Sequence, residues 1–318
     1  MSILVVGSVA YDSVKTSAGS RQDALGGSAT YFSVAASFLA PVAVVAVVGD
    51  DFRAEHVGLL EARGVDVTGL ETRAGRTFRW VGEYDAEDMS SRATLDTQLN
   101  VFAGFSPKLD PGHRTSSYLF LANIDPELQM DVLGQFEERP RVVALDTMNF
   151  WIDGKRNDLT RVVKEVDILF MDESEVRSFA GEMNLVKAAG AVIGLGPRTV
   201  VVKRGEHGVL LFGSDWTFAA PAFPLERVVD PTGAGDSFAG GFMGYLCATG
   251  DVSEAGFRRA AVMGSVMGSF AVESFSADRL LALDRDTVVQ RLRALAELAS
   301  FAPIDTDGSF PWRDGPTQ

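Results

Sequence analysis

Residues 228–246, VVDPTGAGDSFAGGFMGYL, place a glycine-containing turn and a carboxylate where a helix is expected to begin. Asp230 precedes a proline, so the chain there is expected to be extended rather than helical. Gly233, Ala234 and Gly235 leave their backbone N–H groups accessible to a ligand, because they carry small side chains or none. The N-terminus of the following helix adds unpaired amides and the positive end of the helix dipole. Together these groups predict a seat for an anion such as a phosphoryl group.

Asp236 directly follows that seat. Phosphoryl transfer has a loose transition state, so an aspartate there needs only to orient an incoming hydroxyl and accept its proton late. The helix dipole favours the charged carboxylate and is expected to lower its pKa. The alternative is that Asp236 caps the helix while the glycines merely turn the chain. These residues alone leave both interpretations open.

Two common nucleotide-binding motifs are missing from the sequence. The 228–246 stretch lacks the Gly-Lys-Ser/Thr ending of a Walker A loop. The N-terminal run VVGSVAYDS lacks the G-x-G-x-x-G pattern of a dinucleotide fold. A nicotinamide-dependent reaction is therefore not favoured.

The charge balance excludes two classes of partner. The 318 residues include 43 acidic and 29 basic side chains, which gives a net charge of −14. Such a field repels nucleic acid and anionic membranes, so we expect neither as a partner. A nucleotide triphosphate could bind only where helix ends and a divalent cation reverse the sign locally.

Cysteine, histidine and hydropathy patterns give further exclusions. Cys247 is the single cysteine, so no internal disulfide can form, and the three histidines show no metal-binding spacing. The N-terminal segment is not predicted to be a signal peptide, and no run of 18 apolar residues is present. We therefore expect a cytoplasmic protein.

Short β-branched runs alternate with longer segments of helical period. Most of the runs are apolar throughout, as in parallel strands that are covered on both faces. The alternation predicts a doubly wound α/β domain with a mostly parallel sheet flanked by helices. Strands are expected at 3–6, 42–48, 118–122, 142–146, 167–171 and 199–203, and helices at 28–39, 126–138 and 184–194, with almost continuous helix from 237 to about 300.

One region, about residues 76–103, interrupts this alternation with strand-like pieces such as TFRWVGEY and no helix between them. We expect antiparallel strands there that project from the main sheet as a small lid, joined by about residues 13–22. The alternative is a surface hairpin with no role. Residues 1–300 are expected to form one domain, and residues 301–318, rich in Pro, Gly and Asp, an irregular C-terminal extension.

The thirteen residues DPTGAGDSFAGGF resemble the C-terminal signature of the ribokinase-like, or phosphofructokinase B (PfkB), carbohydrate kinase family. In that family the Gly-Ala-Gly-Asp segment forms an anion hole, and its aspartate is the catalytic base. The resemblance implies that Gly233, Ala234 and Gly235 form the anion hole and that Asp236 is the base. It also implies a ribokinase-like fold, with ATP and Mg2+ as cofactors.

Other segments resemble the same family along nearly the whole chain. GGSATYFSVAASFLA implies that Gly26 and Gly27 lie against a sugar-like substrate, and VGSVAYDSV implies that Asp12 hydrogen-bonds its hydroxyls. The segment VVKRGEHGVLLF resembles the strand and turn near the nucleotide and implies that Lys203, Gly205 and Gly208 bind ATP. A solvated charge at a strand end is the alternative for Lys203. The predicted lid resembles the family's β-sheet lid, which covers the substrate and often mediates homodimers.

Two positions depart from the family pattern. Members usually carry Asn-x-x-Glu where this chain has Asp172 and Glu175, and that motif organises magnesium and its waters. A carboxylate is a competent oxygen ligand, so Asp172 and Glu175 remain the magnesium candidates; an acidic helix start is the alternative. Tyr31 stands where members commonly have Asn. It could contact a flat or partly apolar substrate, or it could belong to the core.

Three further polar residues complete the candidate site. Asp230 and Thr232 match positions that in many members help to bind a monovalent cation, usually K+, and Thr232 also belongs to the ATP-binding set. Asn123 follows the predicted strand YLFLA, at the strand end where open α/β sheets bind ligands, so it is a candidate substrate contact. Turn chemistry is the alternative for Asn123.

The resemblance implies an ATP-dependent kinase that transfers the γ-phosphoryl group to a hydroxymethyl group of a sugar or sugar derivative. The first alternative is a nucleoside kinase with an adenosine-like substrate. Its base could stack on aromatic side chains, namely Tyr31, Phe32 and the lid aromatics Phe78, Trp80 and Tyr84. The second is a non-catalytic ligand sensor that retains the fold. An intact base and anion hole favour the enzyme over the sensor.

Overall fold

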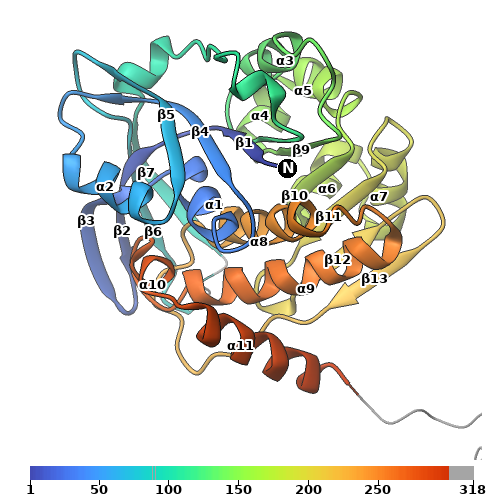
Figure 1. Cartoon of the computed structure of the whole chain (residues 1–318). Coiled ribbons are helices and arrows are strands. Elements are labelled where there is room, and N and C mark those ends of the chain that lie inside the picture. Colours follow the sequence, from blue (N-terminus) through green and yellow to red (C-terminus); the bar gives the residue numbers. More distant parts are fainter. Residues whose placement is uncertain (88, 90, 301–318) are drawn as a thin grey trace, which may run out of the picture.

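A computed structural model describes residues 1–87, 89 and 91–300 (Figure 1). Within these residues, a nine-stranded sheet has the strand order β13-β12-β11-β10-β9-β8-β1-β4-β5, and a four-stranded sheet has the order β3-β2-β6-β7. All neighbouring strands from β5 to β11 pair in parallel, and only β12 and β13 are antiparallel. The predicted segment 301–318 lies outside the described residues.

The strands of the large sheet form where the sequence is apolar at consecutive positions. In β1, Ile3 and Val5 face one hydrophobic core and Leu4 and Val6 face a second one, because successive side chains of a strand point to opposite faces. Both cores are buried, so neither face of the central strands needs a polar side chain. The strands are β1 (Ile3–Val6), β4 (Val42–Gly49), β5 (Val65–Arg73), β8 (Tyr118–Leu121), β9 (Val142–Asp146), β10 (Ile168–Asp172), β11 (Thr199–Lys203), β12 (Val209–Phe212) and β13 (Thr217–Ala220).

Helices cover both faces of this sheet (Figure 1). One face packs against α1 (Ser28–Ala36), α2 (Ala54–Ala62), α8 (Ala234–Thr249), α9 (Glu254–Ala271), α10 (Asp278–Leu281) and α11 (Arg285–Leu298). The other face packs against α3 (Pro126–Gly134), α4 (Asn149–Gly154), α5 (Arg156–Val163), α6 (Glu173–Ala180) and α7 (Leu185–Ile193). Short 3-10 turns occur at Asn100–Gly104, His113–Thr115 and Gly205–His207. The predicted α/β class and the six predicted strands are confirmed.

Helix α8 approaches α1 very closely, and its glycines allow this. A Cβ at Gly240 would lie 2.3 Å from the carbonyl oxygen of Phe32 in α1. This contact holds the N-terminus of α8 beside the carboxyl ends of the central strands. The glycines of the GAGDSFAGGF run thus serve packing as well as the anion seat.

The four-stranded sheet, called the lid below, contains β2 (Ala10–Thr16), β3 (Gly19–Gly26), β6 (Arg79–Tyr84) and β7 (Arg92–Gln98). β2 pairs with β3 and β6 pairs with β7 in the antiparallel sense, but β2 and β6 are parallel. The antiparallel strands predicted within residues 76–103 are therefore confirmed as β6 and β7, and the predicted partner segment 13–22 joins them through β2, which runs parallel to β6. Among the described helices, none is both long and apolar enough to cross a bilayer.

Candidate active site

The N-terminus of α8 is built as an open anion seat. Gly233 is the N-cap residue, with a left-handed φ of 75° that favours glycine, and no side chain caps the helix there. A Cβ at Gly233 would also lie 2.3 Å from the Tyr31 ring, so a larger residue does not fit. Asp236 lies in the first turn and does not act as the cap. The interpretation of Asp236 as a helix cap is therefore wrong.

A buried ion pair lies next to the seat. The Nζ of Lys203, at the end of β11, lies 2.7 Å from Oδ2 of Asp146, at the end of β9. A Cβ at Gly235 would lie 3.2 Å from the same Nζ. The Lys203 side chain is 20% exposed and that of Asp146 is 5% exposed, so Lys203 is not a freely solvated charge. It places a positive charge beside the amides of residues 233–235.

The pKa of Asp236 is shifted in the direction opposite to our expectation. Burial, followed by the nearby charge of Asp146, raises the pKa of Asp236 to about 7, against the influence of Lys203 and Arg92. The helix dipole alone would have lowered it. A carboxyl group with a pKa near neutrality is well matched to the role of a general base.

The Gly26-Gly27 turn encloses Asp12. The backbone N–H of Gly27 donates to Oδ2 of Asp12 at 3.4 Å, and a Cβ at Gly26 would lie 2.0 Å from that oxygen. Asp12 is 6% exposed, and burial raises its pKa to about 7, with further contributions from Asp230 and Asp236. The structure thus brings Asp12 and the two glycines together, close enough to Asp236 for the two carboxyl groups to interact.

Tyr31 belongs to the core rather than to an open binding surface. It is 1% exposed, and its ring packs under Gly233. Its hydroxyl has no hydrogen-bond partner among the described residues, and burial raises its pKa. The ring therefore shapes the anion seat from below, as the core interpretation expected, and has no free face for stacking.

Asp172 and Glu175 form a capping box at the start of α6. The N–H of Glu175 donates to Oδ1 of Asp172 at 2.8 Å, and the N–H of Asp172 donates to Oε2 of Glu175 at 2.6 Å. Burial raises the pKa of Glu175 to about 8. Asp172 and Glu175 therefore form the acidic helix start that was the alternative to a magnesium site. The other two carboxylate oxygens, Oδ2 of Asp172 and Oε1 of Glu175, take no part in the capping box. Among the described residues, no cluster of three or more His, Cys, Asp or Glu side chains could hold a metal by itself.

Asp230 organises the loop before α8. Its Oδ1 accepts from the N–H of Thr232 at 2.9 Å, and its Oδ2 accepts from the N–H of Ser276 at 3.4 Å. Asp230 is 1% exposed, and burial raises its pKa. These bonds fix the shape of the loop.

The remaining candidates lie at strand ends. Oδ1 of Asn123 accepts from Nε1 of Trp151 at 2.9 Å, so Asn123 positions α4. Gly205 and Gly208 lie in the turn between β11 and β12, both with positive φ. At Gly208 a Cβ would lie 2.1 Å from the carbonyl oxygen of Ala220, which makes glycine necessary for this turn.

The lid reaches the loop before α8 through two contacts. Oγ1 of Thr232 donates to the hydroxyl of Tyr84 at 3.2 Å, and Oγ1 of Thr16 donates to the carbonyl oxygen of Val229 at 2.7 Å. Arg92 lies directly opposite Tyr84 in the β6–β7 pair, and its charge lowers the pKa of Asp236. Asp146 and Arg92 were not predicted from the sequence. Asp146 ends a predicted strand and could have been found by the reasoning applied to Asn123, whereas nothing in the sequence marks Arg92.

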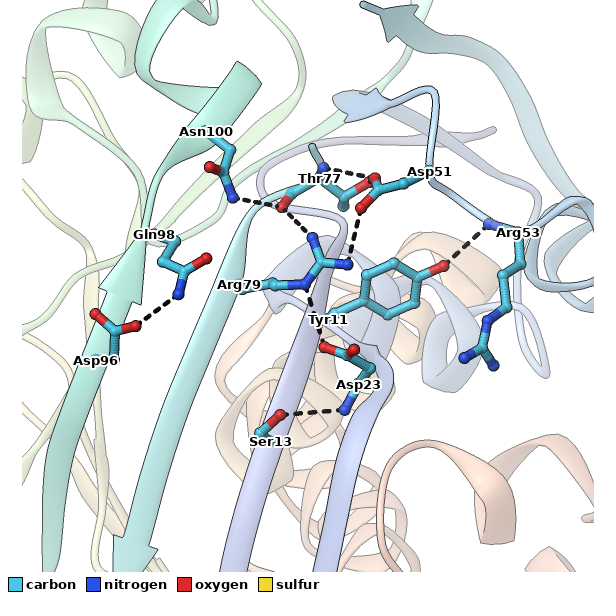
Figure 2. Close-up of polar contacts among 10 residues, drawn as sticks. All are labelled: Tyr11, Ser13, Asp23, Asp51, Arg53, Thr77, Arg79, Asp96, Gln98 and Asn100. Atoms are coloured by element: carbon cyan, nitrogen blue, oxygen red, sulfur yellow. Dashed lines mark hydrogen bonds and ion pairs between the residues drawn. The ribbon is translucent and has the colours of Figure 1, made fainter. Parts of the chain in front are cut away.

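A polar network joins the base of the lid to the large sheet (Figure 2). Arg79 of β6 pairs with Asp51, which follows β4, at 2.8 Å, and with Asp23 of β3 at 3.2 Å. Asp51 also accepts from the N–H of Thr77 at 2.7 Å and from its Oγ1 at 2.6 Å. The ring of Tyr11 lies beneath the Arg79 guanidinium, 5.1 Å from ring centroid to Cζ. Arg79 thus connects both halves of the lid to the end of β4.

Comparisons with known proteins agree with this geometry. The pfkB family carbohydrate kinase model matches residues 141–281. A cytidine kinase from Thermococcus kodakarensis is 31% identical over 249 residues, which cover 77% of this chain and 88% of that protein. A nucleoside kinase from Methanocaldococcus jannaschii, described as an archaeal member of the ribokinase family, superposes with a TM-score of 0.74 at 19% identity, covering 92% of this chain and 98% of that chain.

A fructokinase from Vibrio cholerae, solved with fructose, ADP and calcium ion bound, superposes with a TM-score of 0.75 at 19% identity and the same coverage of 92% and 98%. The likeness to these two structures shows the ribokinase-like fold, and the sequence likeness to the cytidine kinase shows the family. The chain belongs to the pfkB family of carbohydrate kinases, and it is a phosphotransferase with an alcohol group as acceptor.

Proposed function

We propose that the protein transfers the γ-phosphoryl group of ATP to a hydroxymethyl group of a sugar or sugar derivative at the N-terminus of α8. One observation carries this proposal: a carboxyl group with a pKa of about 7, Asp236, lies in the same helical turn as an uncapped anion seat. Such an arrangement supports a reaction between an acceptor hydroxyl and a phosphoryl group.

The residues around the seat have three different tasks in the proposed reaction. Asp236 orients the acceptor hydroxyl and takes its proton as the new O–P bond forms. The amides of Gly233, Ala234 and Gly235 stabilise charge on the transferred group, and Lys203 adds a positive charge beside them. Asp12, with Gly26 and Gly27, holds the other hydroxyls of the acceptor.

ATP and magnesium fit the donors that the structure provides. Lys203, Thr232 and the turn containing Gly205 and Gly208 would hold the nucleotide. Magnesium would be bound through Oδ2 of Asp172 and Oε1 of Glu175, directly or through water, because the capping box uses the other two oxygens. The metal would neutralise phosphate charge in a protein whose net charge is −14.

A nucleoside is the second candidate acceptor, and the likeness to a cytidine kinase favours it. A nucleoside is itself a sugar derivative with a hydroxymethyl group, so the same seat serves both candidates. Scoring ATP consumption across sugars and nucleosides separates them.

Three secondary proposals accompany this function. Asp230 and Thr232 would help to bind a monovalent cation. Comparing the activity in potassium salts with the activity in choline salts tests this proposal.

The edge strand β7, where Leu95 is 59% exposed, would join two copies through the lid. A monomeric molar mass in sedimentation equilibrium would contradict this proposal. Because the reaction uses ATP, we place the protein in the cytoplasm, which fractionation of the source cells tests.

The replacement Asp236→Asn tests the proposed function. We expect the variant to fold normally and to lose turnover by about 10²- to 10⁴-fold, the usual contribution of a general base. The matched control is Asp215→Asn, which neutralises an exposed carboxylate in the β12–β13 turn and leaves turnover unchanged. Wild-type turnover in Asp236→Asn would refute the mechanism, and an absence of ATP-dependent phosphorylation by the wild type on every acceptor would favour a ligand sensor.

A further inference from the structure

One face of the lid looks toward the anion seat. In the parallel pair of β2 and β6, Asp12 lies opposite Trp80. Alternate residues of a strand share a face, so Trp80, Gly82 and Tyr84 lie on the same face as Asp12. Tyr84 of this face contacts Thr232 in the loop before α8. The Trp80 side chain therefore leaves the lid on the side of the proposed reaction.

Trp80 is held flat against its own strand. A Cβ at Gly82 would lie only 2.0 Å from Cη2 and 2.4 Å from Cζ2 of Trp80, so the indole occupies the space that a side chain at Gly82 would need. Its Nε1 donates to Oγ1 of Thr94 on β7 at 3.2 Å. These two contacts fix one face and one edge of the ring, and Trp80 nevertheless remains half-buried. A rigid aromatic surface is thus presented from the lid.

The other aromatic residues proposed for stacking are already engaged. Phe78 stacks on Phe102 with ring centroids 5.3 Å apart. Tyr31 is 1% exposed beneath Gly233, and Tyr84 is 5% exposed. Among Tyr31 and the lid aromatics Phe78, Trp80 and Tyr84, Trp80 is therefore the residue whose ring is fixed and still partly exposed to a ligand.

We propose that Trp80 stacks on the heterocyclic base of a neutral nucleoside while Asp12 binds its sugar hydroxyls. This inference rests on the proposed function and assigns its acceptor class. Adjacent strands are about 4.8 Å apart, so a ring on the indole places an attached sugar within reach of Asp12. A fixed indole suits a flat base, because base–aromatic stacking is favourable for every base.

The carboxyl groups around this subsite disfavour a nucleotide as acceptor. Asp12, Asp230 and Asp236 lie close enough together for their charges to affect one another. A phosphate already present on the acceptor would meet these three carboxyl groups, whereas the nearby cations, Lys203 and Arg92, act on Asp236. The structure therefore assigns the unphosphorylated nucleoside rather than a nucleoside monophosphate.

The test compares acceptors with and without a base on matched lid variants. Trp80→Ala is expected to raise KM for cytidine and adenosine by about tenfold or more, within the range that base stacking contributes, and to leave KM for ribose unchanged. Gly82→Ala keeps the indole but displaces it, and the same selective loss is expected. Val81→Ala alters the opposite face of the same strand and serves as the control that changes neither KM.

Equal losses for ribose and nucleosides, or no loss for either, would overturn the assignment. If the wild type phosphorylates no acceptor, the proposed function fails, and calorimetric binding of cytidine still tests Trp80. Affinity at least tenfold lower in Trp80→Ala and in Gly82→Ala would then support the subsite. Equal affinity in all variants, or no binding by the wild type, would reject it.

Discussion

Two cations approach Asp236, and they come from different parts of the chain. Lys203 ends β11 and is fixed by Asp146, whereas Arg92 lies on the edge strand of the lid and keeps its side chain partly in solvent. Both oppose the rise in the pKa of Asp236. We predict that Arg92→Ala lowers kcat by about 10- to 10³-fold, because a positive charge that acts on the proposed base is lost. The acid limb of the pH–rate profile should move to higher pH, since Asp236 loses a neighbour that favours its ionised form.

Arg92→Lys keeps the charge and should retain most of this effect on the pH profile. Lys15→Ala is the matched control, because Lys15 is also a lid cation but forms an exposed pair with Glu83. An unchanged kcat and an unchanged pH profile in Arg92→Ala would show that the lid cation does not reach the reaction.

Arg79 positions the lid relative to the large sheet, because it joins β3 and β6 to the end of β4 (Figure 2). Its side chain is 13% exposed, so these ion pairs are better shielded than ordinary surface pairs. We predict that Arg79→Met lowers the free energy of unfolding by roughly 1–3 kcal/mol, because Asp23 and Asp51 lose their cation. A looser lid should also raise KM for the acceptor and increase ATP hydrolysis without acceptor, since water is excluded less well. Urea denaturation and a coupled ATPase assay measure these effects.

The control for this element is Lys15→Met, which removes an exposed ion pair between β2 and β6 and should change stability by less than about 0.5 kcal/mol. If Arg79→Met lowered stability while leaving KM and the uncoupled ATPase rate at wild-type values, the network would support the fold but not lid closure.

The stability of the whole molecule should depend on pH because several buried carboxyl groups are held near neutrality. The pKa values of Asp12 and Asp236 are raised from 3.8 to about 7, and that of Glu175 from 4.5 to about 8. Between the unfolded pKa values near 4 and the folded pKa values of about 7 to 8, the folded protein binds more protons than the unfolded chain. The free energy of unfolding therefore falls as pH rises through this range. We predict a lower melting temperature at pH 8 than at pH 5.5. Burial lowers the pKa of His56 from 6.5, so this residue makes the free energy of unfolding rise with pH just below pH 6.5.

Asp236→Asn removes one of these groups. Its melting temperature at pH 8 should exceed that of the wild type, and the difference should shrink at pH 5.5. The opposite ordering at pH 8, or a difference that does not depend on pH, would contradict the raised pKa of Asp236. Activity should rise over the same pH interval because the proposed base, Asp236, must be ionised. Stability and catalysis would then change in opposite directions with pH.

The layers of the fold and the candidate anion seat follow from local features of the sequence. A uniformly apolar strand such as 42–48 is stable only when both faces of its sheet are covered, which predicts helices on each side. The Gly-Ala-Gly-Asp turn before a helix is formed by consecutive residues and can be recognised from them alone. For the same reason, the predicted strand and helix positions required no knowledge of distant contacts.

The tertiary structure decided what depends on distant neighbours. The pKa of Asp236 is set by burial and by Asp146, 90 positions earlier in the chain, which outweigh the local helix dipole. Tyr31 became a core residue because α1 places it beneath Gly233. Asp12 lies opposite Trp80, and Arg92 opposite Tyr84, only because β2, β6 and β7 lie side by side in the lid. Pairing between strands that are far apart in sequence leaves no mark in either strand alone, which is why Arg92 and the position of Trp80 opposite Asp12 were not predictable, although Asp12 itself was a candidate.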